Sequence, residues 1–140
     1  MNTVERFCHT EKFKGKASDV VAVPIGGGQK MLFFSGISAE RPEGRWMHAD
    51  VGGGVDIDTQ TRAAWSRIKE MLSIHRGQLQ DIVKVTFYST DSRYLMNPIA
   101  SIFVELFEGG NVPAATGVVV SGLAWPELLI EIDVIAVVAA

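Results

Sequence analysis

The sequence predicts an α+β fold in which one mostly antiparallel sheet carries two helices on a single face. Several segments have the short or alternating apolar pattern that is typical of strands. Two other segments have apolar residues three or four positions apart, which predicts helices with one buried face. The predicted order is strand, strand, helix, strand, helix, strand, strand. Because no proline- or serine-rich linker interrupts this order, residues 1–140 are predicted to form a single domain.

The first two strands are predicted at residues 20–23 and 31–34. Both segments are apolar, and they are separated by Pro24 and by three glycines at 26–28, which favour a turn. A further strand near residues 4–9 is an open alternative.

The first helix is predicted from residue 61 onward. Its apolar stripe consists of Ala64, Trp65, Ile68, Met71, Leu72 and His75. Asp58 or Thr59 is expected to cap its N-terminus, and Gly77 is expected to end it.

A second helix follows, with a stripe formed by Ile99, Ile102, Phe103 and Leu106. Pro98 fits best in its first turn, where a missing N–H group is harmless, and Asn97 is then the expected N-cap. If the helix begins as early as Asp91, Pro98 is expected to kink it instead.

Three later strands are predicted at residues 82–88, 118–120 and 128–138. In the first of them Val83, Val85 and Phe87 alternate with polar residues and are expected on the buried face. Two helices can cover only one face of the resulting sheet. Since a bare apolar face favours association, the chain is expected to form a homo-oligomer.

The composition argues against several classes of protein. The net charge is −3, with 13 basic and 16 acidic residues that are interspersed, so no basic stripe for nucleic acid is expected. The single cysteine, Cys8, forms no metal-binding motif, and the glycine triplets match no nucleotide-binding motif, so neither a metal nor a cofactor is expected. The apolar run at 128–140 contains two carboxylates and is too short to cross a membrane. A cytoplasmic protein without membrane contact is predicted.

The last strand contains the candidate catalytic groups. Glu131 and Asp133 share one face, about 7 Å apart, while their neighbours are apolar. A carboxylate in such surroundings can have a raised pKa and act as a general acid or base. The alternative is that both carboxylates face water or pair with basic side chains.

At this strand, together with earlier segments, the sequence resembles the Rid (YjgF) family, whose founding activity is the hydrolysis of reactive enamines and imines. The resemblance rests on residues 34–38, 81–86, 97, 103–107, 112–114, 122–126 and 131–136. It implies a chorismate-mutase-like fold that forms a homotrimer around a central barrel. It also implies an active cleft at each subunit interface. Glu131 would activate the attacking water, and Ser35, Gly36 and Asn97 fall on substrate-binding positions.

One position departs from the family pattern. The family's catalytic arginine, which binds the substrate carboxylate, is replaced here by Ala115. In its place Arg41 or Arg45 is a candidate cation, because both lie in the loop that borders the cleft in the family. The same loop resembles that of relatives that deaminate 2-aminomuconate. Trp125, in a loop that also borders the cleft, is expected to line it.

Three hypotheses follow, and the sequence leaves open whether the chain is an enzyme. The first is hydrolytic deamination of an enamine or imine, 2-aminomuconate-like, with Glu131 activating water and the backbone near Gly36 and Ala115 holding the substrate. The second is a non-catalytic protein that binds or senses a small molecule in the same cleft. The third is a structural or partner-binding trimer.

Overall fold

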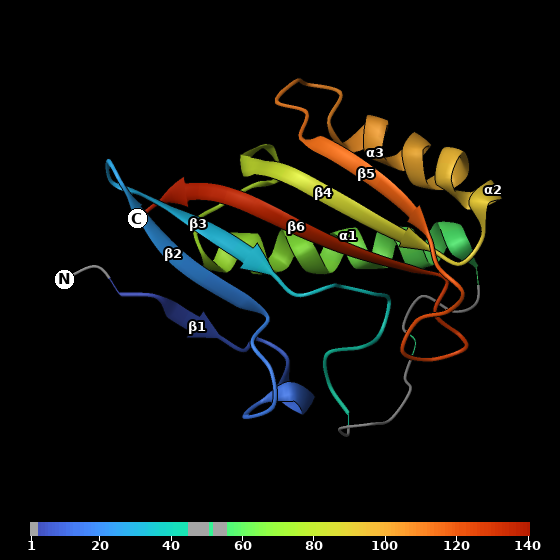
Figure 1. Ribbon diagram of the computed structural model, residues 1–140, viewed down its shortest axis with the longest axis horizontal. Coiled ribbons are helices and arrows are strands. Elements are labelled where there is room, and N and C mark those ends of the chain that lie inside the picture. The colour runs from blue at the N-terminus through green and yellow to red at the C-terminus, as the bar shows by residue number, and fades with distance from the viewer. Residues whose placement is uncertain (1–2, 45–50, 52–55) are drawn as a thin grey trace.

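Six strands form one sheet in the computed structural model, which describes residues 3–44, 51 and 56–140 (Figure 1). The strands are β1 (Glu5–Phe7), β2 (Val20–Gly26), β3 (Gln29–Phe34), β4 (Ile82–Ser89), β5 (Ala114–Val119) and β6 (Ile130–Ala139). Their order across the sheet is β1-β2-β3-β6-β4-β5. All neighbours are antiparallel except β4 and β5, which run parallel. The mostly antiparallel sheet is therefore confirmed, including the strand near the N-terminus.

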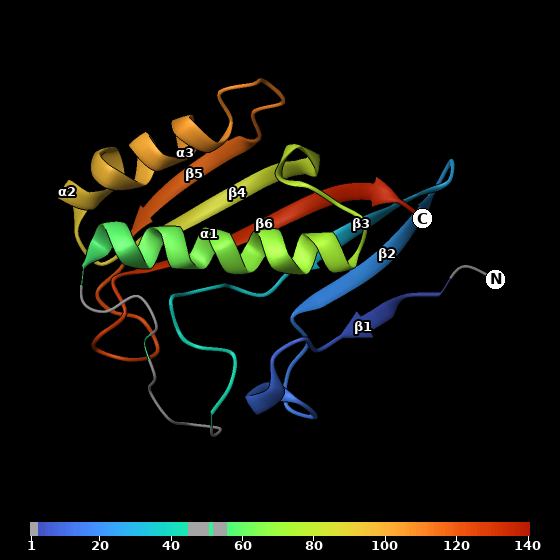
Figure 2. The ribbon, with the colours of Figure 1, turned by 180° about the vertical axis from the view of Figure 1, so that it is seen from behind.

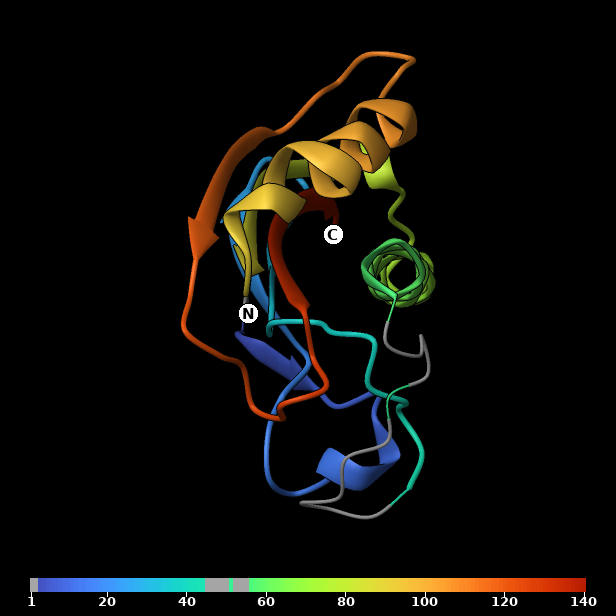
Figure 3. The same ribbon diagram turned by 90° about the vertical axis from the view of Figure 1, so that its right-hand side faces the viewer.

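Two helical segments pack on the same face of this sheet, as predicted. The first is α1 (Ile57–Ile74), and the second comprises α2 (Ser92–Tyr94), η3 (Leu95–Ala100) and α3 (Ser101–Leu106). Two single helical turns, η1 (Glu11–Phe13) and η2 (Leu79–Asp81), lie in the connections. Figures 2 and 3 show both helical segments on one side of the sheet. In the described part of the chain, no helix has the length and apolar character to cross a membrane.

The core lies between the helices and one face of the sheet. Alternate residues of β6, including Ile130, Ile132 and Val134, are buried there, and α1 contributes Ile68 and Leu72. This alternation follows from the two-residue period of a strand. It leaves Glu131 and Asp133 on the other face.

The other face is bare among the described residues and carries an apolar surface on its β2–β3–β6 part. That surface includes Val21, Val23, Met31, Phe33, Ile135 and Val137, of which Phe33 is 39% exposed. Figure 3 shows no helix on this side. The trimer that would cover it stays a prediction.

Two details of the first helix differ from the sequence expectation. The N-cap is Asp56, whose carboxylate accepts from the Asp58 N–H at 2.9 Å, so neither Asp58 nor Thr59 is the cap. At the other end Arg76 adopts φ 61° and the Gly77 N–H bonds to the Leu72 carbonyl. The left-handed residue that follows the helix is therefore Arg76, one position before Gly77, the glycine that was expected to end the helix.

The second helix follows the alternative in which it starts early. Asp91 caps it by accepting from the Arg93 N–H at 2.9 Å. Asn97 has extended dihedrals (φ −150°, ψ 114°) and interrupts the segment before Pro98, because the proline ring disfavours a helical conformation in the preceding residue. Asn97 is therefore not the N-cap of an uninterrupted helix.

The prediction that Val83 lies on the buried face of its strand is wrong. The β4–β6 register shifts between Ile82 and Lys84, and Val83 is 46% exposed while Ile82 and Val85 are buried. A bulge adds one residue to a strand, which moves that residue out of the alternation.

A pair of histidines joins β1 to the C-terminus of α1. His9 Nε2 and His75 Nε2 are 2.9 Å apart, and His75 is buried beside the Phe7 ring. Burial lowers the pKa of His75, and His9 and Lys30 lower it further, against a smaller opposing effect of Glu5.

This lowered pKa predicts a loss of stability in mild acid. Between the pKa of His75 in the folded chain and its ordinary value of 6.5, the unfolded chain binds more protons, so the free energy of unfolding falls as the pH falls. The contribution is at most about 1.4 kcal/mol per pH unit. Urea unfolding at pH 5.5 to 7.5 should show a weaker pH dependence in His75→Gln than in the wild type. Equal slopes in the two proteins would contradict the prediction.

Candidate functional site

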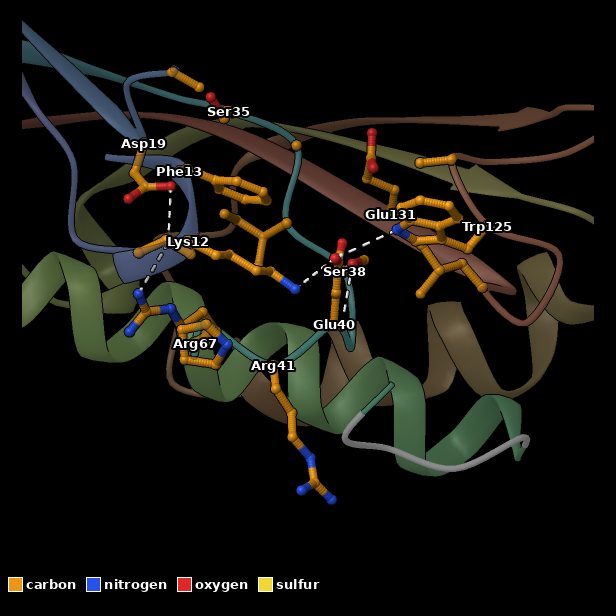
Figure 4. A pocket seen from close by; sticks show the side chains of 17 residues that line it. Lys12, Phe13, Asp19, Ser35, Ser38, Glu40, Arg41, Arg67, Trp125 and Glu131 are labelled. Atoms are coloured by element: carbon orange, nitrogen blue, oxygen red, sulfur yellow. Dashed lines mark hydrogen bonds and ion pairs between the residues drawn. The ribbon is translucent and has the colours of Figure 1, made fainter. Parts of the chain in front are cut away.

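A cavity of about 340 Å³ opens beside β6, at the end of the sheet where Glu131 lies (Figure 4). Five parts of the chain form its walls: η1 and its flanks, the loop after β3, the loop before β6, one side chain of α1, and Glu131 of β6 itself. The polar lining comprises Thr10, Lys12, Asp19, Ser35, Ser38, Glu40, Arg41, Arg67 and Glu131. The remaining lining residues are Phe13, Ala17, Gly36, Ile37, Pro42, Ala124, Trp125 and Leu128. A cavity of this size with a few convergent polar groups has the properties of a small-molecule site.

Gly36 lies directly against the Glu131 side chain. Ile37 and Ile132 exchange two backbone hydrogen bonds (2.7 and 2.8 Å), which hold the chain after β3 beside β6. A Cβ atom at Gly36 would lie 2.7 Å from Cδ of Glu131 and still closer to its Oε2. Glycine is therefore required at this position for Glu131 to keep its place.

Glu131 has the electrostatic character of a candidate acid or base. Its pKa is raised above 4.5, first by burial and then by the nearby charges of Asp133 and Glu40. Among the described residues, none donates a hydrogen bond to its carboxylate. A half-buried carboxylate without such donors retains its proton to higher pH than an ordinary glutamate does, which suits a general acid or base.

Asp133 differs from Glu131 although both lie on the same face of β6. Its Oδ2 accepts from the Tyr88 hydroxyl at 3.0 Å, and this bond raises the pKa of Tyr88. Asp133 does not line the cavity. Of the two carboxylates that the sequence singled out, the geometry favours Glu131 as the reactive one.

A buried ion pair lies in the lining of the cavity, and the sequence analysis did not predict it. Lys12 Nζ lies 2.5 Å from Oε1 of Glu40, with the side chains 1% and 15% exposed. The Trp125 indole N–H donates to the same oxygen at 3.3 Å, as the dashed lines in Figure 4 show. Three separate parts of the chain are thereby tied together. No periodicity marks the segment that contains Lys12, so no local pattern could have predicted its burial.

Hydrogen bonds also fix the N-terminal wall. The buried Asp19 carboxylate accepts from the Thr10 hydroxyl at 3.0 Å and from the His9 N–H at 2.5 Å. Arg67 of α1 donates to the His9 carbonyl at 2.7 Å and to the Thr10 hydroxyl at 3.2 Å. Because Asp19 and Arg67 serve these bonds, they hold η1 in place rather than offering charges to a ligand.

The structure brings together five of the residues predicted to form the site. Ser35, Gly36, Arg41, Trp125 and Glu131 all line the cavity. The Ser35 hydroxyl donates to the Ser18 carbonyl at 2.6 Å. In Figure 4 the Arg41 guanidinium points away from Glu131. Arg45 lies outside the described residues.

Asn97 and Ala115 do not line this cavity. Asn97 is exposed at the break in the second helix, where its Oδ1 accepts from the Ser101 hydroxyl at 3.4 Å. Ala115 lies on β5 and pairs with Val85 of β4. Both residues are on the helix-covered side of the sheet, whereas Glu131 is on the opposite side. Within one chain the two residues therefore do not meet, and their meeting across a subunit interface stays a prediction.

Comparison with known proteins shows relatives along nearly the whole chain. The sequence profile of the family described as Endoribonuclease L-PSP matches residues 18–138. A RutC family protein from Pyrococcus horikoshii is 39% identical over 84 residues, which span 58% of this chain and 62% of that protein. The match thus covers less than two thirds of the relative's length.

Two solved structures have the same fold. One is a member of the highly conserved YjgF/YER057c/UK114 family from Mycobacterium tuberculosis, with a TM-score of 0.73, 27% identity, and coverage of 97% of this chain and 100% of that one. The other is a conserved Rid-family protein of unknown function from Yersinia pestis, with a TM-score of 0.70, 29% identity and 89% coverage of both chains. These similarities confirm the resemblance and the fold expected from it.

Proposed function

Because the chain belongs to the endoribonuclease L-PSP (YjgF/Rid) family, we propose that it hydrolyses a reactive enamine or imine in the cavity beside Glu131 and releases ammonia. The observation that carries this proposal is the Glu131 carboxylate, which lines the cavity with a raised pKa and no hydrogen-bond donor among the described side chains.

Glu131 acts as the base in the proposed reaction. It takes a proton from water while the water oxygen attacks the imine carbon, and it then delivers this proton to the imine nitrogen, which gives a carbinolamine and returns Glu131 to its ionised form. The carbinolamine then transfers its hydroxyl proton to nitrogen through Glu131. The C–N bond breaks, leaving a carbonyl product and ammonia. A carboxylate with a raised pKa suits both transfers, because it is a stronger base than an ordinary glutamate.

A homotrimer with a cleft at each subunit interface is part of the proposal. The apolar surface of β2, β3 and β6 supports it, since a face of this kind is normally covered in the assembled protein. Nucleic acid is a poorer candidate ligand for this chain. Its net charge is −3, and its cavity contains three carboxylates.

A second candidate function is small-molecule binding without catalysis. The observation that favours it is Ala115, which stands where the family resemblance implies an arginine. Without that arginine, a bidentate contact to the substrate carboxylate is lost.

Ammonia release distinguishes the two functions. A coupled assay should compare enzymatically generated 2-iminopropionate with 2-aminomuconate, for the wild type and for Ala115→Arg. We expect the wild type to act on 2-aminomuconate, and Ala115→Arg to raise turnover of 2-iminopropionate about tenfold or more, because a charge-assisted bidentate contact is restored.

The oligomeric state of the wild type and of Ala115→Arg must be measured alongside the activity. Light scattering coupled to size exclusion should give a trimer for both proteins. If neither protein releases ammonia from either substrate above the uncatalysed rate, the hydrolytic proposal is wrong and the binding function is favoured.

A further inference from the structure

The segment that contains Lys12 forms a wall of the cavity although it precedes the part of the chain that matches the family. The family profile begins at residue 18, whereas Thr10, Lys12, Phe13 and Ala17 line the cavity. The family profile therefore does not include these residues of the wall. The side chains of this wall that contact a ligand should determine which members of the substrate class bind.

Lys12 brings a buried positive charge to this wall. Its side chain is 1% exposed, and its ammonium lies 5.7 Å from the centre of the Phe13 ring. An ammonium group has three N–H donors. Among the described residues it has one acceptor, Oε1 of Glu40. Two donors of a buried cation thus have no protein acceptor in the described part of the chain, and buried donors normally find one.

Glu40 serves to position Lys12. One of its oxygens receives both the Lys12 ammonium and the Trp125 indole N–H. Figure 4 shows these two side chains approaching Glu40 from opposite sides. The ammonium is therefore held in a defined place before any ligand arrives, which reduces the entropy that binding must overcome.

The other cations of the lining are less suited to receive a ligand. Arg67 donates to the His9 carbonyl, to the Thr10 hydroxyl and to Glu70. The guanidinium of Arg41 is directed away from Glu131 (Figure 4). Lys12 is the cation of the described lining that combines burial, a fixed position and spare donors.

We infer that Lys12 binds the carboxylate of the substrate, the task that the family resemblance assigns to an arginine at the position of Ala115. The inference rests on the proposed function and narrows it. The substrate is an enamine or imine that carries a carboxylate on an apolar, unsaturated body. Phe13, Trp125 and Leu128 contact that body, and the carbon to be attacked lies toward Glu131.

Binding of matched probes tests the inference without any turnover. Calorimetry should compare sorbate, a six-carbon diene carboxylate, with its neutral amide (2,4-hexadienamide) and with 2,4-hexadienylamine. The wild type should bind sorbate more tightly than the other two probes. Lys12→Met should weaken sorbate binding about tenfold or more, because a charge-assisted contact is lost, and should leave binding of the amide within about twofold.

A charge-balanced variant guards against misfolding. Lys12→Met alone leaves the Glu40 carboxylate without its cation, so the double variant with Glu40→Gln should be measured as well, together with its thermal melt. Lys14→Met is the matched control, because Lys14 lies in the same segment with its side chain 60% exposed and should bind sorbate as the wild type does. Lys12→Arg should retain most of the affinity.

Three results would overturn the inference: sorbate binding by the folded double variant within twofold of the wild type, tighter wild-type binding of the amine than of sorbate, or no wild-type binding of any probe. A failure of the proposed function is distinguishable from these. It would appear as absent ammonia release while sorbate binding still depends on Lys12.

Discussion

Replacing Glu131 by glutamine should reduce ammonia release by about 10²–10⁴-fold, the usual contribution of a general base. Glutamine has nearly the same shape, so the cavity and the contact with Gly36 remain, but the amide cannot take a proton from water. The measurement is kcat/KM for 2-aminomuconate in the coupled assay. The matched control is Asp133→Asn on the same face of β6, which removes a carboxylate outside the cavity and should reduce kcat/KM far less than Glu131→Gln does.

The same Glu131→Gln variant should be more stable than the wild type at neutral pH. Burial raises the pKa of Glu131 above 4.5, so the folded chain retains this proton to higher pH than the unfolded chain does. Stability therefore falls as the pH rises from 4.5 through the pKa of Glu131 in the folded chain. Glutamine removes this penalty, and we expect a higher free energy of unfolding at pH 7 than in the wild type, measured by urea unfolding. In the ammonia assay, release at the wild-type rate by Glu131→Gln would show that Glu131 is not the base.

Gly36→Ala should reduce kcat/KM about 10–100-fold while changing stability little. The added Cβ would lie 2.7 Å from Cδ of Glu131, closer than carbon atoms can approach without a shift. The atoms that it meets are the far end of a flexible side chain, so the Glu131 carboxylate moves and the backbone stays. A displacement of about 1 Å at the reacting group is sufficient for a loss of this size.

A matched glycine substitution separates this effect from backbone stiffening. At Gly109 an added Cβ meets no atom within 4 Å, so Gly109→Ala should have the wild-type kcat/KM. The readouts are kcat/KM and the thermal midpoint of both variants. If Gly36→Ala turned over substrate as fast as Gly109→Ala, the place of Glu131 beside Gly36 would be irrelevant to the reaction. A large drop in its thermal midpoint would show that the backbone shifts instead.

The predictions from sequence that succeeded depend on periodic burial. The alternation along residues 128–134 predicted that Ile130, Ile132 and Val134 share one face and that Glu131 lies on the other, and the first three are buried in the core. The stripe along α1 predicted the buried residues Ile68 and Leu72 in the same way. Such patterns can be recognised in a sequence because buried apolar side chains recur with the period of the helix or strand. Several residues of one element therefore indicate the same buried face.

Features that depend on one residue or on distant contacts were decided by the tertiary structure. The bulge at Val83 arises from the pairing of β4 with β6, which one strand alone does not specify. Lys12 is buried because Glu40 and Trp125, from two other loops, enclose its charge. Arg41 belongs to the predicted loop, yet its guanidinium points away from Glu131. A charged side chain has no periodicity of its own, and its position is set by whichever partners the fold brings within reach.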